Sequence, residues 1–378
     1  MKILITGSDG FIAKNLKMRL SENKIFQIIC FSRSNDSSQL ASLVKNVDFI
    51  FHLGGVNRPD DEKEFAADNI EFTRQLSCAV ADVAKSTGKK IAVVFASSVQ
   101  ATQATPYGRS KYNAERILRD VEADYGIPVY IFRLSNVFGK WCKPNYNSVV
   151  ATFCYNIARD LPIKIFDSEA AIPLVYVDDV IETFIQLIEG RAPMGQKDGF
   201  FSIEKQYSLT VGELASQIRV FKESRDTLIT DRVGKGLMRA LYSTYLSYLP
   251  PSSFSYSIPA HRDARGVFVE MLKTPDCGQF SFFTALPGIT RGGHYHHTKT
   301  EKFLVIKGFA RFRFRHMDSG EEFEIVSSGD EPEIVETAPG WTHDITNTGL
   351  EEMIVMLWAN EIFDPARPDT FACPFETL

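Results

Sequence analysis

The strongest constraint on the fold lies in the first thirteen residues, which read MKILITGSDGFIA. A short β-branched apolar run over residues 2–6 ends at Gly7, and a helical pattern begins after Gly10. Glycine at these two positions permits a tight turn and lets the backbone approach a pyrophosphate at the amino terminus of the helix. The order strand, glycine-rich turn, helix therefore predicts a dinucleotide-binding site. Its expected cofactor residues are Gly7, Ser8, Asp9, Gly10, Phe11 and Ile12.

The alternation of strand and helix continues to about residue 190. Apolar runs lie at 26–31, 47–53, 91–97 and 128–134, and the segments between them have helical spacing. Strands that are apolar along their whole length are typical of a parallel sheet covered by helices on both faces. This part of the chain is therefore predicted to be an α/β doubly wound parallel sheet of the Rossmann type.

The period of the pattern changes towards the carboxy-terminal third. Residues 250–260 are rich in proline and serine, which is typical of a linker. Beyond them, short apolar runs are separated by turn residues, which indicates an all-β sandwich or barrel. The predicted organisation is a nucleotide-binding domain over 1–249, a linker over 250–260 and an all-β domain over 261–378.

The composition excludes two classes of partner. The chain has 42 basic and 47 acidic residues, a net charge of −5, without a block of basic residues. Neither nucleic acid nor a membrane surface is therefore an expected partner. The first apolar run is too short for a signal peptide, and no run approaches the ~20 residues of a membrane span. The six cysteines form no CxxC pair, which suits reduced thiols in a cytoplasmic protein.

The end of the second predicted strand bears on the choice of cofactor. NAD enzymes commonly carry a carboxylate there, which binds the ribose 2′-hydroxyl. This chain has Ser32, Arg33 and Ser34 instead, and a guanidinium beside hydroxyls suits the 2′-phosphate of NADP. NADPH is therefore the expected cofactor, although an arginine that contacts only solvent would give the same sequence.

A tyrosine and a lysine four residues apart, Tyr107 and Lys111, follow the segment FASSVQA and open a helix. One helical turn places the lysine beside the tyrosine, where its charge is expected to lower the pKa of the phenol. Ser98 can hydrogen-bond a substrate oxygen whose charge changes. The three residues therefore predict proton exchange with a substrate oxygen.

At these positions the chain resembles the extended short-chain dehydrogenase/reductase family. The matching segments are GSDGFIA, FHLGGVN at 51–57, Asn69, the Ser98–Tyr107–Lys111 set and VYVDDV at 175–180. The resemblance implies that this set is catalytic and that Lys111 also holds the nicotinamide ribose. It further implies cofactor contacts from Leu53, Gly54 and Gly55.

The sequence departs from that family in two places. Ser98 and Tyr107 are only nine residues apart, which leaves Ser97 as an alternative hydroxyl. Residues 33–47 also leave little room for the family's third strand.

A loop after the strand at 128–134 is a candidate for substrate binding. The segment FGKWCKPNYNSVVATF at 138–153 follows a strand end, which in a doubly wound sheet lies at the ligand-binding edge. Its lysines, tryptophan and asparagines suit a nucleotide sugar, although a solvated loop has a similar composition. The expected substrate-binding residues of this region are Asn136, Lys140, Trp141 and Asn145.

The carboxy-terminal part contains the histidine-rich segment GGHYHHTKTE at 292–301. Residues i and i+2 of a strand face the same way, so His294 and His296 are expected to point together into the barrel, with Glu301 returning opposite them. His343 follows in the segment PGWTH. Three imidazoles and a carboxylate suit Zn, Fe, Mn or Ni. The spacing resembles the two motifs of the cupin family, which implies that these four residues bind a metal ion.

A second resemblance gives His294 a different role. Residues 263–270 and the segment RGGH at 291–294 resemble another cupin branch, the 3,5-epimerases of 4-keto-6-deoxy nucleotide sugars. In that branch the histidine removes a proton from the sugar and is not a metal ligand. The resemblance implies that Lys302 is catalytic and stabilises the enolate. It implies substrate contacts from Arg265, Phe268, Glu270 and Arg291.

Together the two halves resemble one family of bifunctional capsular-polysaccharide enzymes, over essentially the whole chain. In that family a zinc-carrying cupin epimerises C3 of a UDP-4-keto-6-deoxy-N-acetylhexosamine, and the other domain reduces C4 with NADPH to UDP-2-acetamido-2,6-dideoxy-L-talose. The resemblance implies the same UDP-sugar, NADPH and Zn²⁺ here, for capsule or O-antigen synthesis. By analogy with cupins, a homodimer through the cupin domain is expected.

Two other functions fit parts of the same pattern. One is a nucleotide-sugar 4-epimerase or dehydratase with tightly bound NAD, against which Arg33 argues. The other is a regulator that senses NADP without catalysis. Proteins of that kind usually lack the tyrosine–lysine pair that is present here.

Overall fold

The computed structural model describes residues 1–59, 61–191, 199–263, 266–269, 271–274, 278–361 and 364–375, with the backbone alone at 260–263, 266–269 and 279. The chain forms two compact units. The first comprises Met1–Ser148 and Ile172–Ser208, and the second comprises Val149–Ala171 and Leu209–Leu378. Each unit is therefore built from two separate stretches of sequence.

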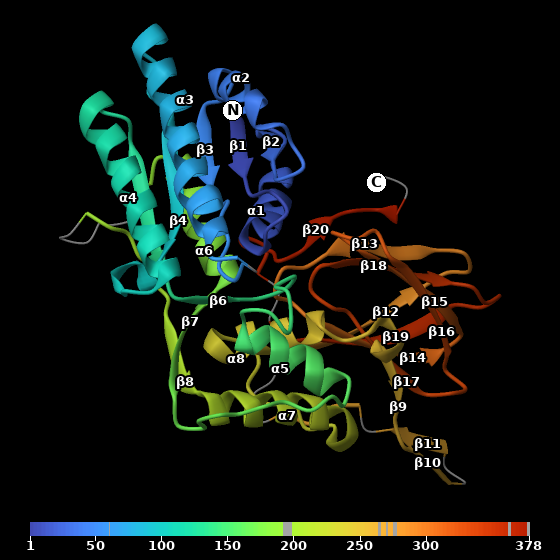
Figure 1. Ribbon diagram of the computed structural model, residues 1–378. Coiled ribbons are helices and arrows are strands. Elements are labelled where there is room, and N and C mark those ends of the chain that lie inside the picture. The colour runs from blue at the N-terminus through green and yellow to red at the C-terminus, as the bar shows by residue number, and fades with distance from the viewer. Residues whose placement is uncertain are drawn as a thin grey trace. The chain divides into compact units, whose positions relative to one another are not determined.

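A five-stranded parallel sheet is the centre of the first unit, with the strand order β2-β1-β3-β4-β5 (Figure 1). The strands are β1 Lys2–Thr6, β2 Gln27–Phe31, β3 Phe49–His52, β4 Ala92–Ser98 and β5 Val129–Leu134. This confirms the predicted doubly wound parallel sheet. Strand β2 is added on one side of β1, and β3, β4 and β5 are added on the other, so the strand order switches between β1 and β3. Ligands of such folds bind at the carboxyl ends of the strands at that switch point.

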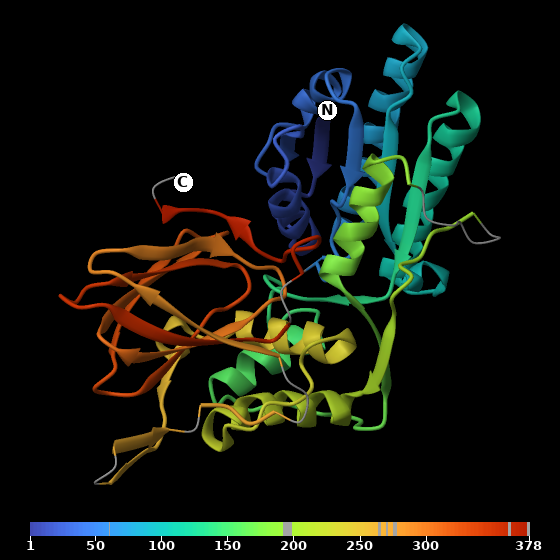
Figure 2. The same ribbon diagram turned by 180° about the vertical axis from the view of Figure 1, so that it is seen from behind.

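Helices cover both faces of this sheet. On one face, Leu76 and Leu118 pack with apolar residues of the strands in a single core cluster. On the opposite face, which Figure 2 shows, the ring of Phe184 lies 5.3 Å from that of Phe51 and 5.2 Å from that of Phe132. The helices are α1 Phe11–Ser21, α2 Leu40–Lys45, α3 Phe72–Thr87, α4 Pro106–Tyr125 and α6 Val177–Ile188. Among the described residues, no helix combines the length and the apolar character that a membrane crossing needs.

Shorter elements complete the first unit. The stretch between β2 and β3 forms a 3₁₀ turn and the short helix α2, so the strand order ends at β2 and the family's third strand is not formed there. Three further strands make a small sheet in the order β6-β7-β8. These elements are η1 Ser37–Gln39, η2 Phe65–Glu71, η3 Val99–Thr102, β6 Asn136–Phe138, β7 Ala171–Tyr176 and β8 Tyr207–Thr210.

Two five-stranded sheets dominate the second unit, in the orders β12-β19-β14-β17-β9 and β16-β15-β18-β13-β20. Their paired strands are antiparallel. Phe303 of the first sheet and Phe312 of the second meet with ring centres 5.6 Å apart, so the sheets enclose an apolar core. The ten strands of these sheets are β9 Ser255–Ser257, β12 Gln279–Ala285, β13 Thr290–Tyr295, β14 Glu301–Lys307, β15 Phe309–His316, β16 Glu322–Ser328, β17 Glu333–Glu336, β18 Trp341–Asn347, β19 Met353–Ala359 and β20 Phe371–Ala372. A separate antiparallel pair is formed by β10 Ala260–Asp263 and β11 Gly266–Val269. This agrees with the predicted all-β cupin-type barrel.

Three helices belong to the second unit, α5 Val149–Ala158, α7 Val211–Thr227 and α8 Gly236–Ser247. They contact one another, and Ser243 of α8 donates a hydrogen bond to the carbonyl of Thr298 at 2.8 Å. The segment predicted to be a linker contains the turn η4 Pro251–Ser253 and the strand β9, which pairs with β17. The boundaries predicted at 249 and 261 stay predictions, while the compact units divide elsewhere because these helices pack with the β-sheets.

Candidate functional sites

The glycine-rich turn after β1 packs directly against the loop after β3. Gly7 has a φ of +65°, and a Cβ atom there would lie 2.5 Å from the Cα atom of Gly54. The amide of Gly10 donates to the carbonyl of Gly7 at 2.9 Å, and α1 begins at the next residue without a side-chain cap. An uncapped helix terminus of this kind can bind an anion through its amides. The residues present therefore fit the pyrophosphate of a dinucleotide.

A cavity of about 430 Å³ lies beside this turn. Most of the predicted cofactor residues line it. They are Gly7, Asp9, Gly10, Arg33, Leu53, Gly54 and Gly55. Ser8, Phe11 and Ile12 are not among the described residues that line it. Sequence reasoning missed Asp68 of η2, which lines the same cavity and pairs with Arg33 at 2.5 Å. Only the fold brings these two residues together, 35 positions apart in the sequence.

The predicted catalytic residues meet at the end of β4 and the start of α4. The hydroxyl groups of Ser98 and Tyr107 are joined by a hydrogen bond. Ser97, the alternative hydroxyl, donates instead to Oε1 of Glu115 at 2.5 Å. The geometry therefore favours Ser98 as the partner of Tyr107.

Burial is the largest cause of the pKa shifts of Tyr107 and Lys111. It raises the pKa of Tyr107, and the hydrogen bond with Ser98 opposes this only in part. The expectation that Lys111 lowers the pKa of the phenol is wrong for this structure, because the ammonium donates to the carbonyl of Ala96 at 3.0 Å. Burial also lowers the pKa of Lys111 to about 8, and the nearby carboxylate of Glu115 acts in the opposite direction.

Asn69 holds the loop after β3 next to this set. Its side chain accepts a hydrogen bond from the amide of Val56 at 2.8 Å and donates to the hydroxyl of Ser110 at 2.8 Å. A Cβ atom on Gly55 would lie 2.8 Å from Oδ1 of Asn69 and 3.3 Å from Nζ of Lys111. Lys111 is therefore a near neighbour of the loop that lines the cavity.

The predicted substrate-binding loop is only partly exposed to a ligand. Lys140 is 2% exposed, and its ammonium pairs with both carboxylate oxygens of Asp178, at 2.9 and 3.2 Å. Lys140 is therefore committed to an internal ion pair, which contradicts its predicted role. Asn136 donates to a backbone carbonyl of β7 at 3.0 Å. Trp141 and Asn145 both have a positive φ, so they mark sharp turns of this loop.

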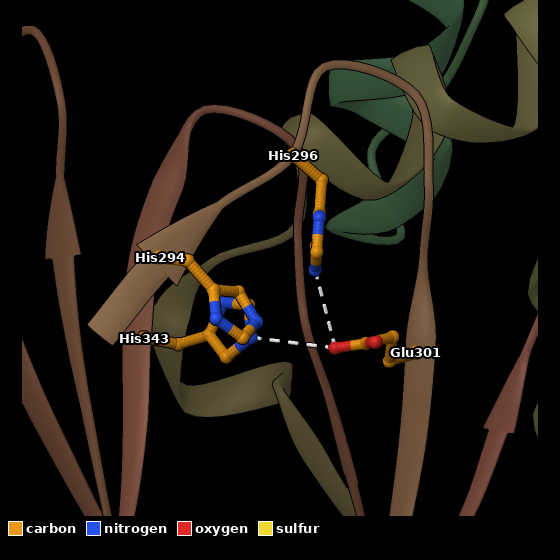
Figure 3. A group of neighbouring side chains, drawn as sticks. All are labelled: His294, His296, Glu301 and His343. Atoms are coloured by element: carbon orange, nitrogen blue, oxygen red, sulfur yellow. Dashed lines mark hydrogen bonds and ion pairs between the residues drawn. The ribbon is translucent and has the colours of Figure 1, made fainter. Parts of the chain in front are cut away.

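The four predicted metal ligands converge inside the second unit (Figure 3). His294 lies on β13, His296 follows that strand, Glu301 begins β14 and His343 lies on β18. Their candidate ligand atoms all lie within 4.8 Å of one another. Oε2 of Glu301 is 3.2 Å from Nε2 of His296 and 3.4 Å from Nε2 of His343. His297 is not part of this cluster, as strand parity predicts.

The electrostatics of the cluster suit a cation. Burial, together with the neighbouring imidazoles, lowers the pKa of His294 to about 3, and burial lowers that of His343 as well. Burial alone would raise the pKa of Glu301, but His296 and His343 hold it well below its usual range. Nδ1 of His343 has no hydrogen-bond partner among the described residues. Two imidazoles of lowered pKa, at His294 and His343, an ionised carboxylate and a buried polar atom without a partner fit a divalent metal ion.

Lys302 does not belong to this cluster. It follows Glu301 on β14 and so points to the opposite face of the sheet. Its ammonium is buried, pairs with the carboxylate of Glu336 and lies 3.0 Å from the hydroxyl of Tyr256. Glu336 pairs in turn with Arg225 of α7. The structure therefore does not support the predicted catalytic role of Lys302.

The other predicted residues of the cupin substrate site are only partly described. Arg291 is exposed on β13, donates to the carbonyl of Thr284 at 3.2 Å and lies 5.1 Å from the ring centre of Phe283. Arg265 and Glu270 lie outside the described residues, as does the side chain of Phe268.

One further cation stands beside the metal ligands. Nζ of Lys299 lies 2.9 Å from Oε1 of Glu301. Lys299 lies in the turn before β14, where strand parity does not apply, so the sequence pattern gave no sign of this contact.

Two family models match this chain. Residues 3–199 match the NAD dependent epimerase/dehydratase family, and residues 261–371 match the polysaccharide biosynthesis C-terminal domain. The chain is 56% identical over 373 residues to UDP-2-acetamido-2,6-beta-L-arabino-hexul-4-ose reductase from Pseudomonas aeruginosa, which covers 99% of this chain and 98% of that protein.

Solved structures give the same picture. The capsular polysaccharide assembling protein CapF from Staphylococcus aureus is 43% identical, with a TM-score of 0.68 over 99% of this chain and 100% of that chain. UDP-glucuronic acid 4-epimerase from Bacillus cereus is 19% identical, with a TM-score of 0.50 over 59% of this chain and 83% of that chain, and supports the fold alone. The chain therefore belongs to the NAD dependent epimerase/dehydratase family, as a nicotinamide-dependent enzyme of the reductase type joined to a polysaccharide biosynthesis C-terminal domain.

Proposed function

We propose that this protein is a bifunctional nucleotide-sugar enzyme. Its cupin part epimerises C3 of a UDP-4-keto-6-deoxy-N-acetylhexosamine, and its first unit then reduces the C4 ketone with NADPH to UDP-2-acetamido-2,6-dideoxy-L-talose, for capsule or O-antigen synthesis. The name of the Pseudomonas aeruginosa relative, a reductase of a UDP-linked hexulose, supports this substrate class. The observation that carries the proposal is the hydrogen-bonded Ser98–Tyr107 pair near Lys111 and the glycine-lined cavity.

The reduction needs a proton donor at the ketone oxygen. A nicotinamide cofactor, when bound, supplies the hydride that reduces C4. Because burial raises the pKa of Tyr107, the phenol stays protonated at neutral pH and can give its proton to the developing alkoxide. Ser98 orients the phenol through their hydrogen bond, and the buried ammonium of Lys111 favours negative charge nearby.

The choice of NADPH rests on Arg33. Its guanidinium lines the cavity and is 67% exposed, so it is accessible to a 2′-phosphate. The phosphate would compete with Asp68 for this guanidinium. A phosphate dianion offers more charge than one carboxylate, which supports the exchange.

The epimerisation needs an acidified C–H bond beside the ketone. Loss of the C3 proton gives an enolate, and return of a proton to the other face inverts that centre. Zn²⁺ bound by His294, His296, Glu301 and His343 would act as a Lewis acid on the ketone oxygen. Because His294 lies among the other ligands and has a lowered pKa, we assign it to the metal rather than to proton removal. Epimerisation comes first, since reduction of the ketone removes the acidity.

Tyr107→Phe tests the assignment of the reductase. We expect loss of NADPH oxidation with the 4-keto sugar, by about 10²–10⁴-fold if the phenol is the proton donor. Tyr112→Phe is the matched control, because Tyr112 is exposed on the same helix. Equal rates in both variants would refute the role of Tyr107. Deuterium uptake from solvent into the 4-keto sugar, measured without NADPH, should persist in Tyr107→Phe.

Metal content tests the second half of the proposal. We expect about one Zn²⁺ per chain and loss of deuterium uptake after chelation. Deuterium uptake that survives complete removal of metal would refute a metal-assisted epimerisation. We also propose, by analogy with cupins, that the protein forms a homodimer through its cupin part. Sedimentation of the full chain would test this.

A further inference from the structure

The turn between His296 and Glu301 is held by a carboxylate from a distant part of the chain. Oδ1 of Asp369 accepts a hydrogen bond from the amide of His297 at 2.8 Å. Oδ2 accepts from the amide of Thr298 at 2.8 Å, from its hydroxyl at 2.9 Å and from the amide of Lys299 at 2.7 Å. Three successive amides thus point to one carboxylate, an arrangement that binds anions strongly.

The backbone of the same residue contacts a metal ligand directly. The carbonyl oxygen of Asp369 lies 2.6 Å from Nδ1 of His296. A carbonyl can only accept, so Nδ1 carries a hydrogen, and Nε2 is the ring nitrogen left to bind a metal ion. Nε2 is the nitrogen that faces Glu301, at 3.2 Å. The contact therefore fixes the direction of the imidazole and turns Nε2 towards Glu301.

The segment that follows Asp369 pairs with β13, the strand that carries His294. Strand β20 pairs with β13, with Ala372 opposite His294. The amide of Cys373 donates to the carbonyl of Gly293 at 2.7 Å. Arg239 of α8 pairs with the carboxylate of Asp369 at 3.5 Å. The strand pairing, this hydrogen bond and the ion pair therefore hold Asp369 in place beside the turn at 297–299.

We propose that Asp369 is a positioning residue of the metal site: it fixes the imidazole of His296 and the turn at 297–299, so that His296 and Glu301 meet the same cation. The inference rests on the metal site of the proposed function. Asp369 donates no atom to the metal and touches no substrate. Its effect is on the affinity for the metal and the geometry around it, because supporting contacts of this kind orient ligands before the ion binds.

Asp369→Asn is the variant that tests this role. The amide has one acceptor oxygen, and its NH₂ group faces amides that need an acceptor, so the turn loses part of its support. We expect Zn²⁺ affinity, measured by competition with a chelating dye, to fall about 10–100-fold. We also expect the visible absorption of the Co²⁺-substituted protein to change, because that spectrum follows the ligand geometry. Asp364→Asn is the matched control, since Asp364 is exposed in the same segment.

The outcomes separate this inference from the proposed function. If Asp369→Asn binds Zn²⁺ within threefold of the wild type with an unchanged Co²⁺ spectrum, the positioning role is overturned while the metal site stands. An equal loss in Asp364→Asn also overturns it. If the wild type binds neither Zn²⁺ nor Co²⁺, the proposed metal site itself fails, and the positioning role fails with it.

Thr298→Val keeps the inference testable if Asp369→Asn does not fold. It removes the hydroxyl that donates to Asp369 and accepts from Arg239, and it leaves the three amides in place. We expect a loss of Zn²⁺ affinity that is smaller than in Asp369→Asn, about three- to tenfold, with the melting temperature of the metal-free protein little changed. Unchanged Zn²⁺ affinity in this variant would count against the positioning role of Asp369.

Discussion

Replacement of Glu336 by glutamine should destabilise the second unit strongly. The carboxylate is 2% exposed and pairs with the ammonium of Lys302 and the guanidinium of Arg225, both largely buried. The glutamine keeps the shape but removes the charge, which leaves two buried cations without an anion. Breaking a buried ion pair in this way costs about 3–5 kcal/mol. We expect a loss of that size in the free energy of unfolding.

Urea denaturation followed by tryptophan fluorescence measures this loss, because Trp341 and Trp358 both lie in the second unit. Glu351→Gln is the matched control. Glu351 also pairs with a lysine, Lys307, but both side chains are exposed, so solvent screens the pair and little change is expected. If the Glu336 variant loses no more stability than the control, the argument from burial is wrong.

The same pair of variants predicts a dependence on pH. Burial would raise the pKa of Glu336, but Arg225 and Lys302 hold it below its usual value. A carboxyl whose pKa is lower in the folded state stabilises above its unfolded pKa, and the effect is lost as pH falls through the folded pKa. The wild type should therefore lose stability in acid more steeply than Glu336→Gln. Parallel acid profiles would contradict this.

Three further changes test the first unit. Gly7→Ala should weaken NADPH binding more than tenfold in a fluorescence titration, because the left-handed backbone costs ~1–2 kcal/mol and the new Cβ meets Gly54. Unchanged affinity would refute the close approach of the two loops. Glu115→Gln should move the alkaline limb of the reduction profile to lower pH, because Glu115 raises the pKa of Lys111, which burial has lowered to about 8. A limb that stays in place would show that Lys111 does not set it. Arg33→Ala should reduce the affinity for NADPH about tenfold or more and leave that for NADH unchanged. Equal losses for both cofactors would remove the argument for NADPH.

The sequence predicted the features that depend on local pattern. The strands β1 to β5 lie within about two residues of the predicted runs, because strands buried on both faces are apolar along their whole length. Strand parity and the spacing of the histidines predicted the residues of the cluster in Figure 3, whose role as metal ligands stays a prediction. The same parity argument, applied to Lys302, would have placed it on the face opposite Glu301. The resemblance to the 3,5-epimerases led to the other assignment.

The remaining differences depend on contacts between distant parts of the chain. Lys140 looked available in a polar loop, but its partner Asp178 lies 38 positions away. Asp369 lies 68 positions beyond Glu301, and nothing in its neighbourhood resembles a metal motif. Helices α7 and α8 precede the predicted linker in the sequence, but periodicity does not tell which sheet a helix will cover. The compact units therefore divide elsewhere than the predicted linker.

The division of the chain into interleaved units has a consequence for its synthesis. Helix α5 belongs to the second unit, and its apolar residues, Phe153 and Ile157 among them, are buried there. Its helical partners, α7 and α8, emerge from the ribosome only after the last stretch of the first unit. During that interval α5 is an apolar helix without its partners, tethered to a unit that still lacks residues 172–208. The newly made protein therefore exposes an apolar helix from the time α5 is made until α8 has been added, and a chaperone that binds apolar helices would act in that interval.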